Sequence, residues 1–177
     1  MDGRYNLGTQ DIRSLAIQCH ALDCEFDALF NSSTICGYSD RTYNVYTRLL
    51  STALLNLAIS IRVSLNDHLA YRDRASGVSN CGLFDGAGPY NDGSFSFKDV
   101  CDKIIHADEI IRPIEAGTQG ACCTLRGAHR GKPWDFGLGV RIFSEYVLKW
   151  CDEIDAESLS RDRPNNGIQP TREDARG

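Results

Sequence analysis

The longest regular pattern of apolar residues runs through residues 48–71. Apolar side chains recur there every three or four positions, which places them on one line of an α-helix. These positions are Leu50, Leu54, Leu57, Ile61 and Leu65. Leu55, Ile59 and Val63 are apolar as well, but they lie well away from that line. The pattern therefore predicts a central helix that contacts neighbours on more than one side.

Three further segments show helical spacing. Residues 11–30 place apolar side chains three and four positions apart. Residues 96–112 begin with Ser96, a favourable N-cap, and stop before Pro113, which cannot continue a helix. Residues 140–154 carry several large aromatic side chains on their apolar side, where they would close a core. Together with the central helix, these segments predict about four helices.

Between the third and last helices the pattern becomes strand-like. Residues 121–139 contain two short β-like runs around a Gly-containing turn, which predicts a β-hairpin. Pro133 has no N–H, so we expect the second run at the edge of its sheet. Residues 72–96 are rich in Gly, Ser, Asn and Asp and predict an inserted surface loop. Residues 156–177 are polar and punctuated by Pro and Gly, which is typical of a disordered tail.

The predicted fold class is mainly α: a bundle of about four helices, with one small β-hairpin between the third and the last. Residues 1–155 are a comfortable size for a single helical domain around one core. The chain of 177 residues is 42% hydrophobic, an ordinary share for a globular protein. Its eight cysteines are many for this length. Because no secretion signal is visible, we expect them to be reduced and to serve mostly as small core residues.

Charge and hydropathy limit the partners. The net charge of −5 argues against a surface that is basic throughout, so any contact with nucleic acid must be local. The first residues contain no apolar segment of the kind found in signal peptides. The longest apolar run, residues 53–61, is broken by Asn56 and Ser60 and is too short to span a bilayer. We therefore expect a cytoplasmic protein with no membrane partner.

Asp102 and His106 form the first candidate site. They lie one helical turn apart within the predicted helix 96–112, away from its apolar side. A carboxylate at that spacing can hold one imidazole nitrogen and make the other more basic, as proton transfer requires. The spacing predicts an Asp102–His106 pair.

A group of basic side chains at the tip of the predicted hairpin forms the second candidate site. The group consists of Arg126, His129, Arg130 and Lys132. No acidic residue occurs between Glu115 and Asp135, so the tip is a basic finger on an acidic protein. Such a finger is a candidate contact for the phosphates of a nucleic acid. The alternative interpretation is a solvated turn without a binding role.

The segment around His106 resembles a family motif. Residues 101–107, CDKIIHA, lie in a helix of a mainly helical chain. They resemble the motif of the HEPN superfamily (higher eukaryotes and prokaryotes nucleotide-binding domains), which is commonly an arginine, a polar residue, three more residues and a histidine. Asp102 matches the polar position and His106 the histidine, whereas Cys101 occupies the arginine position.

The resemblance implies a function. Active HEPN proteins are typically metal-independent ribonucleases that work as dimers, with two copies of the motif facing each other. They occur in bacterial toxin, antiphage and RNA-processing systems, and the family also has inactive, structural members. Carried over to this chain, the resemblance implies that His106 is a general acid or base that Asp102 orients.

A cation for such a site is available on the central helix. Arg62 precedes His68 by six positions, but His68 continues the apolar line and is interpreted as a core histidine. If the central helix packs against the helix of His106, Arg62 would supply the cation that the motif lacks at Cys101.

Other chemistries find no support in the sequence. The chain has no Cys-x-x-Cys pair, no His-Glu-x-x-His, no Gly-x-Ser-x-Gly and no phosphate-binding loop, so we expect no metal and no small-molecule cofactor. Two hypotheses remain. The first is an RNA-cleaving or RNA-binding homodimer of the HEPN type. The second is a non-catalytic helical module for dimerisation or partner binding.

Overall fold

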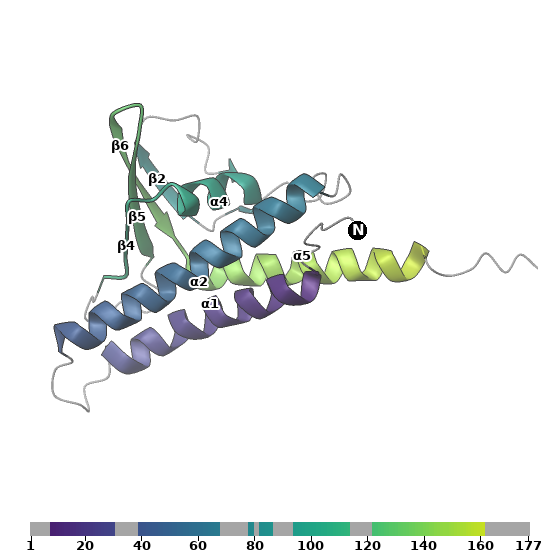
Figure 1. Ribbon diagram of the computed structural model, residues 1–177, viewed down its shortest axis with the longest axis horizontal. Helices are drawn as coiled ribbons and strands as arrows, with labels where there is room; N and C mark the ends of the chain where they lie inside the picture. Colours follow the sequence, from purple (N-terminus) through teal and green to yellow (C-terminus); the bar gives the residue numbers. More distant parts are fainter. Residues whose placement is uncertain are drawn as a thin grey trace, which may run out of the picture.

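A computed structural model describes residues 8–30, 39–67, 78–79, 82–86, 94–113 and 122–161. The fold is mainly α-helical, so the predicted class is confirmed (Figure 1). The helices in these residues are α1 Thr9–Phe30, α2 Asp40–Asp67, α4 Phe97–Ile105 and α5 Val140–Arg161. The strands are β1 Val78–Ser79, β2 Gly82–Gly86, β3 Ser94–Phe95, β4 Glu109–Ile111, β5 Cys123–His129 and β6 Lys132–Leu138.

Helix α2 lies at one side of the helical layer, and the prediction that its second apolar side contacts neighbours was wrong, because Leu55 and Ile59 are 39% and 44% exposed. It packs against α1 and against α4, and α1 also packs along α5. Figure 1 shows α1, α2 and α5 running side by side, with α4 and the larger sheet along one edge of them. The apolar line predicted for the central helix is its buried face: Leu50, Leu54, Leu57, Ile61 and Leu65.

One helix end differs from the prediction. The central helix begins at Asp40, in agreement with the helix start near Arg41 that Ser39 and Asp40 predict as caps, and it is described to Asp67, so His68 lies outside the described residues. The helix predicted over 96–112 ends at Ile105, because the following residues 109–111 pair with β5 as strand β4. The N-cap at the other end is as predicted: the Ser96 hydroxyl accepts from the N–H of Asp99, at 3.2 Å, and the Asp99 carboxylate accepts in turn from the N–H of Ser96, which completes a capping box.

The last helix is longer than the predicted segment 140–154. Helix α5 continues to Arg161, so residues 156–161 of the predicted tail are helical. Ser158 and Ser160 donate hydrogen bonds to backbone carbonyls one turn earlier, at 3.1 and 2.8 Å. These bonds give the polar side chains partners on the helix itself. The rest of the predicted tail, 162–177, lies outside the described residues.

The larger sheet has the antiparallel order β2-β6-β5-β4. Strands β5 and β6 form the predicted hairpin, and its two-residue turn has positive φ at Arg130 (50°) and Gly131 (76°). Such a turn matches the twist of a hairpin. The edge position expected from Pro133 was wrong, since β6 is an inner strand. Pairing with β2 ends at Trp134, so β2 requires no N–H from Pro133.

The predicted loop 72–96 contributes strands instead. Strand β2 extends the hairpin sheet, with Phe84 opposite Phe136 in the register. Strands β1 and β3 form a separate two-stranded antiparallel pair. The apolar run of β2 is only a few residues long and has glycines at both ends, so its period does not distinguish a strand from a loop.

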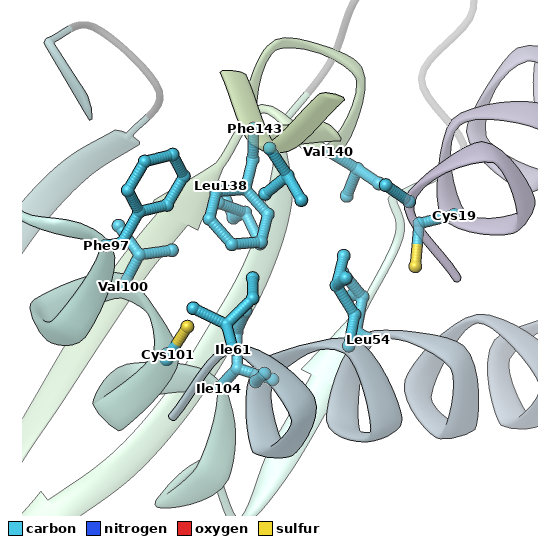
Figure 2. Close-up of a cluster of buried hydrophobic side chains, with 14 of the residues drawn as sticks. Cys19, Leu54, Ile61, Phe97, Val100, Cys101, Ile104, Leu138, Val140 and Phe143 are labelled. Atoms are coloured by element: carbon cyan, nitrogen blue, oxygen red, sulfur yellow. The ribbon is translucent and has the colours of Figure 1, made fainter. Parts of the chain in front are cut away.

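The core lies between the helices and one face of the sheet. Figure 2 shows labelled side chains from α1, α2, α4, β6 and α5 converging on one cluster. Ile61 of α2 lies beside Ile104 of α4, whereas Leu54 of α2 lies on the side of Cys19 of α1, and all of these side chains are at most 2% exposed. Four cysteines are part of the core, as predicted, and all of them are fully buried: Cys19, Cys101, Cys123 and Cys151.

A buried ion cluster joins α1, the end of β4 and the start of α5. Asp23 contacts Arg112, with 3.0 Å between Oδ1 and Nε, and Arg141, with 3.4 Å between Oδ2 and Nε. The side chains of Asp23 and Arg112 are 5% and 0% exposed. The guanidinium of Arg112 also lies 4.9 Å over the ring of Phe26. This cluster ties three distant segments of the chain together.

Candidate functional site

A cleft of about 740 Å³ lies where the C-terminal end of α4 meets the β5–β6 hairpin. Both predicted groups of site residues reach it. Helix α4 and the segment after it contribute His106, and the hairpin contributes His129. Both histidines are exposed. The other lining residues are Asp102, Lys103, Ile105, Ala107, Asp108, Ala128 and Trp134.

His106 occupies the C-cap of α4. Its backbone (φ −100°, ψ 12°) leaves the helix, and its N–H donates to the carbonyl of Asp102 at 3.0 Å. Two residues later, the N–H of Asp108 donates to the carbonyl of Arg126 at 2.7 Å, which attaches the segment to β5. The backbone of His106 is therefore held between a helix end and a strand.

Gly127 allows the hairpin to approach this helix end. A Cβ at position 127 would lie 2.7 Å from the carbonyl oxygen of His106 and 2.4 Å from the ring of Trp134. Distances under 3.0 Å are not seen for real Cβ atoms, so a larger residue would push β5 away from α4. Gly127 is thus the packing point that brings His106 and His129 to one cleft.

Asp102 does not hold His106 as predicted. In the described residues no hydrogen bond joins its carboxylate to the imidazole; instead, Oδ1 lies 2.8 Å from Nε of Arg62 and Oδ2 lies 2.8 Å from Nζ of Lys98. Each carboxylate oxygen of Asp102 therefore contacts a cation from another position rather than the imidazole. The pairing inferred from the spacing of one turn was wrong.

Arg62 reaches the neighbourhood of the site as the sequence suggested. Helices α2 and α4 pack together, and Arg62 meets Asp102 on the side of α4 that leads to the cleft. Arg62 does not itself line the cleft among the described residues. It therefore balances the charge of Asp102 rather than facing the imidazoles directly.

Lys103 supplies a cation that the sequence analysis missed. Its Nζ lies 4.3 Å over the ring of Trp134, a cation–π contact at the wall of the cleft. Burial lowers the pKa of Lys103 from the ordinary value of 10.5, and the charge of Asp99 partly opposes this shift. Lys103 precedes His106 by three positions, and this spacing on one helix was the available sequence signal.

Only one member of the predicted basic finger lines the cleft. His129 does, and it faces Lys132 across the turn in the hairpin register. Arg126 lies beside Glu109 and Asp135 of the neighbouring strands, at 3.5 and 3.6 Å. Arg130 forms the turn itself, and Lys132 is exposed. Of the four, His129 is the one positioned for chemistry.

The described residues contain no group of three or more His, Cys, Asp or Glu side chains able to hold a metal ion. The thiol of Cys101, which occupies the arginine position of the motif, is fully buried in the core. The functional groups of the cleft are therefore imidazoles, an ammonium group and carboxylates.

Comparisons with known proteins assign no family to this chain. It matches no protein-family model, and no curated protein and no solved structure matches it. The resemblance of residues 101–107 to the HEPN motif, and the cytoplasmic location, stay predictions. What the cleft does must follow from its own residues.

Proposed function

We propose that the protein binds RNA in the cleft between α4 and the hairpin and cleaves it without a metal ion. The observation that carries the proposal is the presence of two exposed imidazoles, His106 and His129, at one cleft together with the ammonium group of Lys103. A pair of imidazoles can act as base and acid in the same turnover.

The reaction class follows from these groups. One imidazole takes the proton of an RNA 2′-hydroxyl, whose oxygen then attacks the adjacent phosphorus. The bond from phosphorus to the 5′ oxygen breaks, and the other imidazole gives its proton to that oxygen. The products are a 2′,3′-cyclic phosphate and a 5′-hydroxyl. Since the nucleophile belongs to the substrate, DNA is expected to resist cleavage.

The charges around the cleft are compatible with a phosphate. The lining includes Lys103 and two histidines against two carboxylates, Asp102 and Asp108. The charge of Asp102 is already balanced by Arg62 and Lys98. In this proposal the ammonium group of Lys103, which lines the cleft, stabilises the charge that develops on the phosphate oxygens, an electrostatic contribution that is usually large.

The experiment compares histidine variants on a short 5′-labelled RNA in the presence of EDTA. His106→Ala and His129→Ala are each expected to lower the cleavage rate about 100-fold or more, the typical effect of losing a general acid or base. His20→Ala is the matched control, because His20 lies on α1 beside Glu145, at 3.5 Å, and lines no part of this cleft. Its rate should equal that of the wild type.

A second substrate tests the nucleophile. An otherwise identical RNA with a single 2′-deoxyribose should be cut everywhere except at the linkage after that sugar. Cleavage at that linkage, unchanged rates in both histidine variants, or a wild type with no cleavage above background would each show the catalytic proposal to be wrong. The last result would favour the non-catalytic helical module.

A further inference from the structure

Helix α2 has a second apolar face, which points away from the core. Val45, Leu49 and Ile59 are 56%, 53% and 44% exposed, and Val63 is half-buried. Because each residue turns about 100°, these four lie along one line on the side of α2 opposite its buried leucines. In contrast to the expectation from residues 53–61, residues 40–65 are long and apolar enough to cross a membrane by length and composition alone, and half of an 18-residue stretch within them is buried in the fold. An exposed apolar stripe of this length indicates a contact surface.

The spacing along this face is that of a helix–helix seam. The positions are separated by alternating steps of four and three residues, the repeat by which two helices pack side chains into each other. The six seam positions are Val45, Leu49, Thr52, Asn56, Ile59 and Val63. The two polar members stand in the middle, and both are exposed. A polar side chain at such a position fixes the register and number of paired helices.

The seam is complementary to itself when its direction is reversed. When a second α2 helix is placed antiparallel to the first, with Leu54 at the height of Leu54 of the other copy, each apolar seam position faces an apolar one and each polar position faces a polar one. The facing pairs are Val45 with Val63, Leu49 with Ile59, and Thr52 with Asn56. A twofold interface requires this property, because every contact occurs twice with the roles exchanged. A second copy of this chain is therefore the occupant that the pattern fits.

The surroundings of the seam allow such a pairing. No seam position is charged, and the flanking Leu55, 39% exposed, would meet its own copy near the axis. Beside Thr52 and Leu55 the surface is hollowed into a groove of about 250 Å³. The flanking Arg48 would face Arg62 of the second copy, whose charge Asp102 balances at 2.8 Å.

We propose that two copies of the protein associate through the outer face of α2, with the two helices antiparallel and Thr52 paired with Asn56 at the centre. Apolar pairs on both sides supply the association energy, and the central polar pair fixes the register. This proposal is independent of RNA cleavage, because none of the six seam residues lines the histidine cleft.

The first test measures mass in solution. Light scattering should give twice the chain mass of 19.6 kDa for the wild type and 19.6 kDa for the double variant Leu49→Glu/Ile59→Glu. Ile142→Glu is the matched control, since Ile142 on α5 is 44% exposed, the same as Ile59, and lies off the seam. It should remain a dimer. Circular dichroism must show unchanged helicity in each variant, which is expected because all three positions are exposed.

The second test determines the register. Leu49→Glu/Ile59→Lys places opposite charges in contact across an antiparallel seam, whereas Leu49→Lys/Ile59→Lys places like charges there. Within one helix the two positions lie about 15 Å apart and do not pair. The first variant should dimerise, and the second should be a monomer.

Three results would overturn the proposal. They are a monomeric wild type at all concentrations, a dimer that survives Leu49→Glu/Ile59→Glu, and equal behaviour of the two charge-pair variants. A monomeric wild type that floats with phosphatidylcholine vesicles would assign the face to a membrane instead.

Discussion

Two aspartates in this protein each hold two cations, and they differ in burial. Asp23 is 5% exposed and contacts the fully buried Arg112, whereas Asp102 is 32% exposed and contacts Arg62 (25%) and Lys98 (58%). Removing one partner of a buried ion pair is costly, because a charge is left in a medium that solvates it poorly. An exposed pair keeps its water and contributes little.

The two ion clusters also differ in their position in the fold. The Asp23 cluster joins α1, the end of β4 and α5 in the interior and admits no ligand. The Asp102 cluster borders a cleft: Asp102 lines it, and Arg62 and Lys98, which are not among its described lining residues, balance its charge. The same chemical groups are therefore sealed inside the fold in one region and lie beside an open cleft in the other.

The largest expected effect comes from removing the negative charge of each aspartate in turn. Asp23→Asn should destabilise the protein by about 3–5 kcal/mol, since Arg112 then stays buried without its carboxylate. Asp102→Asn makes the same chemical change at the partly exposed cluster and should lower the free energy of unfolding by less than about 1 kcal/mol. Urea unfolding of the two variants beside the wild type measures both values. Equal losses would contradict the contrast between the two clusters.

The second effect tests the packing point on the cleft side. Gly127→Ala should cost about 1–3 kcal/mol, because its methyl group would overlap the ring of Trp134 and the carbonyl of His106. Thermal unfolding measures the loss, and the proposed cleavage should fall with it because the hairpin moves from α4. In a double-mutant cycle with Trp134→Leu, the loss from Gly127→Ala should shrink. Simple additivity would argue against this contact.

The third effect arises only above about pH 9 and concerns the thiol of Cys123, near the Asp23 cluster. Burial raises the pKa of Cys123 from the ordinary value of 9.0 to about 12. The charge of Arg112 has a smaller effect that lowers this pKa, and the charge of Asp23 has a smaller effect that raises it. A thiol whose pKa is higher in the folded state contributes stability below pH 9, and that stability is lost as the pH rises toward 12. The loss should be about 1.4 kcal/mol per pH unit.

The control for this prediction is Cys123→Ala. Unfolding free energies measured from pH 8 upward should decline less steeply in this variant than in the wild type, whatever its absolute stability. Parallel declines would mean that the Cys123 thiol ionises as readily in the folded chain as in the unfolded one.

The helices were predictable because their apolar spacing is strong and local. The end of α4 was not, since Ile110 and Ile111 continue the helical spacing of the sequence but pair with β5. The pairing of β4 depends on residues that follow it in the chain, and a local period carries no information about them. For the same reason β2 was interpreted as part of a loop.

The candidate site was predictable in its parts but not in its assembly. His106 and His129 were selected separately, from a helix and from a hairpin tip, and the fold brings them to one cleft. The pair of Asp102 with His106 failed because Arg62 arrives from α2. Gly127 gave no signal, since its role depends on the close approach of Trp134 and the His106 backbone.

The attachment of His106 on both sides has a kinetic consequence. Its own N–H is bonded to α4, and the N–H of Asp108 is bonded to β5 at 2.7 Å. The backbone of the segment cannot swing without breaking these bonds, so the imidazole moves chiefly by rotation of its side chain, on the picosecond to nanosecond timescale. For the proposed cleavage, this backbone attachment means that the rate would be limited by chemistry or product release rather than by closure of a lid.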